Sequence, residues 1–185
     1  FNNPFGACPT CTGLGTLLKI DPDLVIPDRT LSLAQGCVNV MGWNSGSKGT
    51  IASMYFEALT AHYGASMKTP FQDLPEEVQN AVLYGTGKDK LHIAYRKEFG
   101  SGSFDAPFEG IVTNMERRYR ESTSEYSKQE IERYMTHTPC PDCKGRRLKR
   151  ESLAVTVGET NIADISDLPV KEARTFLSSL RLSKT

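Results

Sequence analysis

Long hydrophobic runs are missing from this sequence of 185 residues. No apolar stretch approaches the roughly 18 residues that a membrane-spanning helix requires, and the N-terminal residues lack the pattern of a signal peptide. An excess of one charge is missing too, because 22 lysines and arginines are balanced by 22 aspartates and glutamates. We therefore expect a cytoplasmic protein with no membrane partner, and the net charge alone neither indicates nor excludes a polyanionic ligand.

Signatures of catalysis are missing as well. The three histidines are scattered along the chain, and no pair of carboxylates stands out. The glycine-rich stretch GWNSGSKG at 42–49 contains Lys48 but lacks the spacing of a phosphate-binding loop, in which serine or threonine directly follows the lysine. We therefore assign no catalytic residue and expect no nucleotide site in this chain.

Cysteine is scarce, but its distribution is informative. Four of the five cysteines form two C-x-x-C pairs, Cys8 with Cys11 and Cys140 with Cys143, whereas Cys37 stands alone between apolar neighbours. A secreted disulfide scaffold is usually shorter and richer in cysteine, so this pattern favours a reducing compartment and metal-bound thiolates. The isolated Cys37 is expected to be a small core residue.

The two C-x-x-C pairs are built alike. Each encloses a proline and is followed, two positions after its second cysteine, by a glycine, Gly13 or Gly145. Glycine adopts a positive φ angle without steric cost, which lets the chain turn its N–H groups toward the sulfur atoms. Two such knuckles supply the four ligands of a tetrahedral structural zinc site. The metal would then clasp together the two ends of a long intervening segment.

Three other interpretations of the cysteine pairs remain open. Each pair could complete its own site with cysteines outside this segment, since Cys8 lies close to the first residue. The pairs could be dithiol redox centres, although no thioredoxin-like βαβ pattern surrounds either of them. They could also be ordinary buried cysteines, although their shared pattern argues against this. His137 is a further potential ligand, which two complete pairs make unnecessary.

The segment between the knuckles has mixed helical and strand patterns, which predicts an α+β fold. Helices are expected at 50–63, within 74–87, and at 114–121, 124–136 and 168–182; the fourth carries a capping-box pattern of Ser127 with Glu130. Strands are expected at 16–20, 31–41, 90–95 and 108–113, and two more within 152–165 on both sides of a turn at Gly158. The glycine-rich stretch 99–107 is expected to be a mobile loop.

Positive charge is concentrated in one part of the chain. Residues 112–150 contain ten lysines and arginines against six acidic residues. Arginine binds phosphate through two parallel hydrogen bonds, and an aromatic ring such as Tyr119 can stack on an unpaired base. A solvated helix face is the plainer interpretation, but the position of the basic run beside a knuckle favours nucleic acid. The candidate DNA-binding residues are Arg117, Arg120, Lys144, Arg146, Arg147, Lys149 and Arg150, whereas Arg118, on another side of its helix, is expected to form a structural ion pair.

Three stretches of the sequence resemble one known family. They are FNNPFGACPTCTGLG at 1–15, the long stretch from FEGIVTNMERRYRE to VGETNI at 108–162, and LPVKEARTFL at 168–177. They are similar to the UvrA family of the bacterial excinuclease ABC, whose members are damage-sensing ATPases of nucleotide excision repair. The resemblance spans the beginning, the middle and the end of the chain. Because the first residue is Phe1 and not methionine, we expect the chain to be a segment of a longer protein.

The resemblance implies a part of the first signature domain together with an insertion domain that the knuckles bracket. We expect a zinc-knuckle base at 1–19 and 112–185 and a mixed α/β insertion domain at 20–111. Family members carry a further C-x-x-C just upstream, which leaves open whether the first pair is completed there or by the second pair. The Walker motifs and the ABC signature fall outside this segment, so it should not hydrolyse ATP by itself. The zinc ligands that the resemblance implies are Cys8, Cys11, Cys140 and Cys143.

The resemblance also implies partners. These are double-stranded and damaged DNA, the rest of a UvrA-like chain, a UvrA dimer partner and a UvrB-like protein. The alternative is a module of a different class, one that organises a dimer or binds an acidic protein partner around a structural zinc. The salt dependence of DNA binding distinguishes a DNA-binding segment from a protein-interaction module. Phosphate binding releases counterions and therefore weakens steeply as the salt concentration rises.

Overall fold

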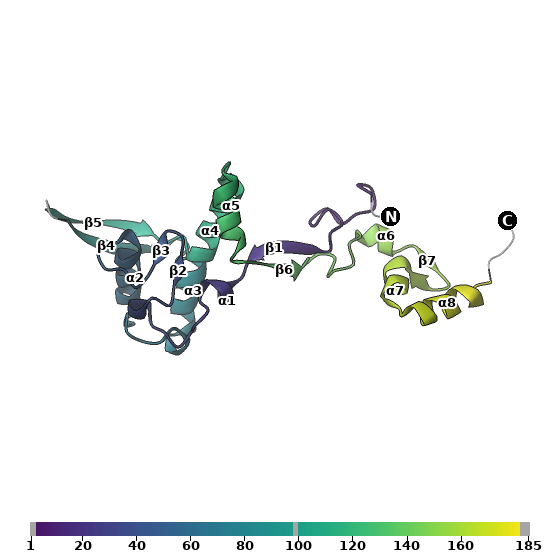
Figure 1. Ribbon diagram of the computed structural model, residues 1–185, viewed down its shortest axis with the longest axis horizontal. Helices are drawn as coiled ribbons and strands as arrows, with labels where there is room; N and C mark the ends of the chain where they lie inside the picture. The colour runs from purple at the N-terminus through teal and green to yellow at the C-terminus, as the bar shows by residue number, and fades with distance from the viewer. Residues whose placement is uncertain (1–2, 98–99, 182–185) are drawn as a thin grey trace. The chain divides into compact units, whose positions relative to one another are not determined.

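The computed structural model describes residues 3–97 and 100–181 (Figure 1). Helices are combined with short two-stranded sheets, which confirms the expected α+β class. The described chain divides into two compact units, one formed by residues 3–18 with 137–181 and the other by residues 19–136. Within the described ranges, every helix is too short or too polar to cross a membrane.

The second unit, residues 19–136, contains most of the helices. The strands β1 (Thr16–Ile20) and β6 (Met135–Pro139) pair with each other and carry the chain between the two units. The other elements of this unit are α1 (Pro22–Val25), η1 (Leu33–Gln35), β2 (Asn39–Val40), β3 (Trp43–Asn44), α2 (Ile51–His62), η2 (Phe71–Asp73), α3 (Glu76–Tyr84), β4 (Lys90–Lys97), β5 (Gly100–Pro107), α4 (Ile111–Glu121) and α5 (Glu125–Glu132).

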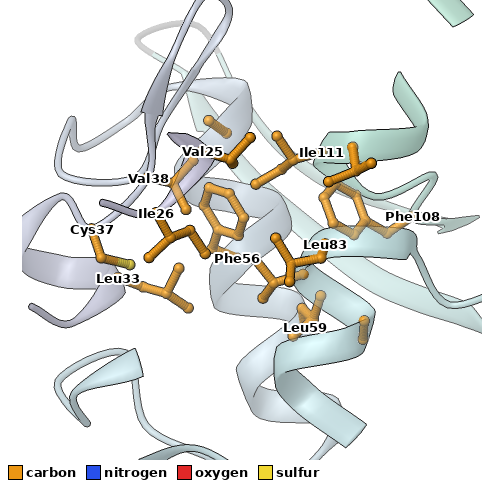
Figure 2. Close-up of a cluster of buried hydrophobic side chains, with 14 of the residues drawn as sticks. Val25, Ile26, Leu33, Cys37, Val38, Phe56, Leu59, Leu83, Phe108 and Ile111 are labelled. Atoms are coloured by element: carbon orange, nitrogen blue, oxygen red, sulfur yellow. The ribbon is translucent and has the colours of Figure 1, made fainter. Parts of the chain in front are cut away.

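The hydrophobic core of the second unit forms around α2. Thr50, the first residue of the helix expected at 50–63, is its N-cap and accepts a hydrogen bond from the Ser53 N–H. Phe56 and Leu59 of α2 are fully buried, and Figure 2 shows Phe56 in the middle of the cluster. Each such side chain stabilises the folded unit by roughly 1.5–3 kcal/mol. Cys37 lies in the same cluster, as the sequence predicted, and burial raises the pKa of its thiol to about 11.

The glycine-rich stretch after β4 is a strand, so the prediction of a mobile loop at 99–107 was wrong. β4 and β5 pair antiparallel, from Lys90 opposite Pro107 to Lys97 opposite Gly100. Gly102 lies opposite Tyr95, whose ring covers the place where a side chain on residue 102 would lie. An aromatic cross-strand neighbour therefore compensates for glycine in this strand. Phe99, the first residue of the predicted loop, lies outside the described residues.

The prediction of a strand at 108–113 was also wrong. Gly110, with a φ angle of +86°, separates β5 from α4, which begins at Ile111. Ile111 and Met115 are buried, so the apolar residues that suggested a strand form the buried face of a helix. Short apolar runs do not distinguish the two structures, and here the pairing of β4 with the preceding glycine-rich residues decides between them.

Two boundaries differ from the sequence prediction for local reasons. The helix expected at 124–136 ends at Glu132, and its N-cap is Ser124, which accepts a hydrogen bond from the Ser127 N–H in place of the predicted capping box. The strand expected at 31–41 is reduced to β2. Ser32 and Gln35 form a reciprocal capping box that begins η1 within the expected strand.

The grouping of residues into units differs from the expected base at 1–19 and 112–185. Residues 112–136 pack with the second unit, because Val112, Met115 and Ile131 lie in its core. The compact second unit thus includes α4 and α5, and the bounds of the insertion domain at 20–111 remain a prediction. That the two units fold independently remains a prediction.

The first unit is smaller and contains both knuckles. Its main buried cluster consists of the four knuckle cysteines with Leu17 packed against them. The closing helix agrees with the sequence prediction. The two strands expected within 152–165 are present but are only two residues long each, because residues 150–153 and 162–167 form helices. The helices and strands after the second knuckle are α6 (Arg150–Leu153), β7 (Thr156–Val157), β8 (Thr160–Asn161), α7 (Ile162–Asp167) and α8 (Val170–Ser179).

Candidate metal centre

The four knuckle cysteines converge in the first unit. Their sulfur atoms all lie within 4.8 Å of one another, and all four residues are buried. The Sγ atoms of Cys8 and Cys140 are 3.9 Å apart, and those of Cys11 and Cys143 are 3.7 Å apart. A disulfide bond requires about 2.05 Å, so the four thiols are free. The structure therefore brings the two C-x-x-C pairs to one place.

Two of the sulfur–sulfur distances match those of a tetrahedrally coordinated zinc ion. With Zn–S bonds of about 2.3 Å, neighbouring sulfurs of a regular tetrahedron lie about 3.8 Å apart. The two observed distances, 3.7 and 3.9 Å, lie on either side of this value. The four cysteines could thus hold one metal ion and would leave no coordination position for a water molecule. Exposed His137 is not part of the cluster.

The backbones of the two knuckles repeat each other with an offset of 132 residues. Thr12 and Lys144, which directly follow the second cysteine of each pair, have φ angles of +50° and +51°. The next residues, Gly13 and Gly145, have φ angles of +85° and +87°, as the glycine pattern predicted. The chain therefore makes the same turn twice.

Reciprocal hydrogen bonds join the two knuckles. The Cys140 N–H donates to the Gly15 carbonyl at 2.9 Å, and the Cys8 N–H donates to the Arg147 carbonyl at 2.8 Å. Arg147 occupies the position equivalent to Gly15, with φ angles of +69° and +81° respectively. The sequence did not indicate that Arg147 would accept this hydrogen bond, because the equivalent residue of the first knuckle is a glycine, Gly15.

N–H groups of the knuckles stabilise negative charge on sulfur. Gly15 donates its N–H to Cys11 Sγ at 3.2 Å. Burial opposes the ionisation of Cys11, but the N–H groups of Gly15 and Gly13 and the thiol of Cys143 together lower its pKa to about 7. At Cys143 burial prevails and raises the pKa to about 11. A cation between the two facing sulfurs would favour the thiolate form of both.

The candidate DNA-binding arginines of α4 differ in their surroundings. Arg117 donates to Glu109 through Nε at 2.7 Å and Nη2 at 3.0 Å, and to Glu121 through Nη1 at 2.9 Å. Arg118 donates to the Met41 carbonyl at 2.9 Å, so it bonds to the backbone and not to the acidic side chain that was expected. Arg120 is exposed. The guanidinium of Arg117 is therefore already engaged by two carboxylates.

The Arg117–Glu109 pair predicts a pH dependence of stability. Hydrogen bonds from Arg117 hold the pKa of Glu109 below its ordinary value of 4.5. A lowered pKa in the folded state means that the ionised form stabilises the fold above pH 4.5, and that this contribution disappears as the pH falls through the folded-state pKa. In thermal denaturation, Glu109→Gln should lower the melting temperature at pH 7, and the difference from the wild type should shrink toward pH 3.

An exposed glutamate of α2 provides the control for this prediction. Glu57→Gln removes the same charge from the same unit and should leave the dependence of the melting temperature on pH unchanged. A Glu109→Gln variant whose melting temperature runs parallel to that of the wild type from pH 3 to 7 would contradict the assignment.

The remaining candidate DNA-binding residues belong to the first unit and surround the second knuckle in sequence. Arg146 forms an ion pair with Asp164 at 3.0 Å. Lys149 is half-buried and precedes the first residue of α6. The side chains that the structure leaves exposed are those of Lys144, Arg146, Arg147 and Arg150.

The fold is that of an α+β module in which four clustered cysteines could bind one metal ion. Its sequence matches a family described as UvrA DNA-binding domain over residues 21–133. The chain belongs to this family, as the three quoted stretches indicated. The matched range includes α4 and α5. It therefore agrees better with the second unit, residues 19–136, than with the expected range 20–111.

Curated relatives and a solved structure agree with this assignment. The UvrABC system protein A of Halalkalibacterium halodurans is 42% identical to the whole chain, and that of Bacillus subtilis is 43% identical. The chain spans only 19% of the length of each relative. The crystal structure of UvrA2 from Deinococcus radiodurans has a TM-score of 0.61 at 24% identity, covering 96% of this chain and 22% of that one, which supports the fold.

Proposed function

We propose that Cys8, Cys11, Cys140 and Cys143 hold one structural zinc ion. The observation that carries this proposal is the convergence of four buried sulfur atoms within 4.8 Å of one another, two pairs of which have the spacing of a tetrahedral site. Thiolate ligands favour zinc, and a shell of four protein ligands leaves no site for an activated water, so the role of the metal is structural and not catalytic. The reciprocal hydrogen bonds between the knuckles also hold the two cysteine pairs together.

We further propose that the chain is a non-catalytic, DNA-contacting segment of a UvrA-type ATPase in nucleotide excision repair. Support comes from the family match and from the whole-chain similarity to UvrABC system protein A. The longer protein would act in the cytoplasm on damaged double-stranded DNA, with a dimer partner and a UvrB-like protein. Within this chain, the exposed basic residues of the second knuckle are the proposed phosphate contacts.

An interaction module that organises a dimer or binds an acidic protein is the second candidate. One observation favours it: Arg117 and Arg146 are already paired with acidic side chains, which reduces the positive charge available to phosphates. The affinity for a DNA duplex of arbitrary sequence, measured at several salt concentrations, distinguishes the two functions.

Two glycine substitutions test the phosphate contacts. Lys144→Gly with Arg147→Gly removes two exposed positive charges, and both positions have positive φ angles that glycine adopts without strain. Each phosphate contact contributes about 0.9 to the slope of log affinity against log salt. The double variant should bind any duplex more weakly, and its slope should be smaller by roughly one to two.

The matched control is Lys171→Ala with Arg174→Ala, two exposed residues of α8 outside the basic run. It removes the same charge from the same unit and should change affinity and slope much less. Unchanged duplex binding in the glycine variant, with its zinc content intact, would favour the interaction module.

A further inference from the structure

The second unit has an apolar pocket that the sequence did not reveal. It has a volume of about 390 Å³, which lies within the range of small-ligand sites, about 300–1,000 Å³. It lies between the first half of α2 and the apolar face of the β4–β5 hairpin. The pocket could not be predicted from the sequence, because one of its walls comes from β5, which was expected to be a loop. Its lining residues are Ile51, Met54, Tyr55, Ile93, Tyr95 and Phe104.

Three aromatic rings face this pocket, and their neighbours hold two of them in place. Tyr55 packs against Phe108 with ring centroids 5.5 Å apart and against the edge of Trp43 at 5.9 Å. Tyr95 lies over Gly102, close enough that a Cβ atom there would be 2.6 Å from its hydroxyl oxygen. The rings are therefore pre-positioned, which lowers the entropy lost when a ligand binds between them.

The rim of the pocket exposes apolar surface to solvent. Ile51 is 71% exposed and Phe104 is 45% exposed, whereas Ile93 at the base is fully buried. The ring centroids of Tyr95 and Phe104 are 6.4 Å apart with a tilt of 46°, so the two rings do not stack closely on each other. The faces of aromatic rings thus remain available to a planar ligand.

We propose that this pocket receives an unstacked base of DNA, an inference that rests on the proposed DNA-binding function. Aromatic rings on neighbouring strands are a general platform for unpaired bases, because every base has a π-face. The pocket lies wholly within residues 21–133, the range that matches the DNA-binding family. Lys48 is exposed three residues before Ile51, and the first turn of α2 has no acidic residue, so the adjoining phosphates meet no negative charge there.

The base must be unpaired or easily displaced, because in a regular duplex it would stay stacked between its neighbours and could not enter the pocket. Stacking on an aromatic side chain is worth roughly 1–3 kcal/mol per base, which corresponds to between about fivefold and 150-fold in affinity. The unit would thereby favour distorted DNA over a regular duplex without recognising any particular base.

Paired and unpaired probes of equal charge test this assignment. The full chain, loaded with zinc, is titrated at fixed salt with a regular duplex and with the same duplex carrying a few mismatched bases. The wild type should bind the mismatched probe about tenfold more tightly. Phe104→Leu, which keeps an apolar side chain but removes the ring, should lose most of this preference and leave affinity for the regular duplex unchanged.

Tyr84→Leu is the matched control, because it removes a half-exposed ring of α3 outside the pocket and should preserve the preference. As a second measurement, 5-iododeoxyuridine at the mismatch should crosslink to Tyr55, Tyr95 or Phe104, the new bond replacing C–I with loss of hydrogen iodide. Equal affinity of the wild type for both probes, an unchanged preference in Phe104→Leu, or crosslinks confined to other residues would overturn the pocket assignment and leave duplex binding intact. Failure to bind either probe would overturn the proposed DNA-binding function itself.

Discussion

Replacing Cys140 by serine should abolish zinc binding and unfold the first unit. The buried cluster of this unit is composed mainly of the four cysteines, so little apolar surface remains to stabilise it without a metal. Structural zinc contributes roughly 10–16 kcal/mol in small metal-dependent domains, and the variant should lose a large part of this free energy. Elemental analysis should fall from about one zinc per chain to near none, and amide exchange in 3–18 and 137–181 should become fast.

Cys37→Ser is the matched control for this result. Cys37 is equally buried but belongs to the hydrophobic core of the second unit and not to the cluster of four cysteines. This variant should keep its zinc and its slow exchange in the first unit. A Cys140→Ser protein that retains one zinc ion per chain would contradict the four-cysteine site.

Gly110→Ala should cause the largest loss of stability in the second unit. A Cβ atom at this position would lie 2.3 Å from Gly85 N and 2.3 Å from the Tyr84 carbonyl carbon, where backbone atoms leave no room for it. The φ of +86° with ψ of +150° at Gly110 is a conformation that essentially only glycine adopts, which adds strain of about 1–3 kcal/mol for alanine. Because the junctions that end α3 and begin α4 must separate, we expect a total loss of about 3–5 kcal/mol in chemical denaturation.

Gly64→Ala separates the two causes of that loss. Gly64 has a φ angle of +64°, but a Cβ atom there would have no neighbour within 4 Å. This variant should lose only the strain, about 1 kcal/mol. Similar losses in the two variants would show that the close approach of Gly85 and Gly110 contributes nothing.

The candidate metal centre could be predicted from the sequence because its pattern is local. The spacing of each cysteine pair and the following glycine determine the turn of each knuckle, and Gly13 and Gly145 have the positive φ angles that this pattern requires. The long segment between the pairs did not prevent their meeting, since loop closure costs little more for a long loop than for a short one. The helices with clear caps and apolar faces, such as α2, were predicted for the same local reason.

Features that depend on contacts between separate elements could not be predicted, even where those elements are neighbours in the sequence. β5 consists largely of glycine, serine and other weak strand formers, and it becomes a strand because β4 offers a partner and Tyr95 covers Gly102. Glu109 precedes α4, so an argument from helix faces alone could not show that it engages Arg117. The apolar pocket follows from the same hairpin and was hidden for the same reason.

Zinc-edge X-ray absorption on the purified chain tests the four-cysteine clasp most directly. The proposed site predicts about one zinc ion per chain with four sulfur neighbours at roughly 2.3 Å. The sulfur spacings of 3.7 and 3.9 Å already correspond to this geometry. A zinc shell containing oxygen or nitrogen, or a folded protein that contains no zinc, would contradict it.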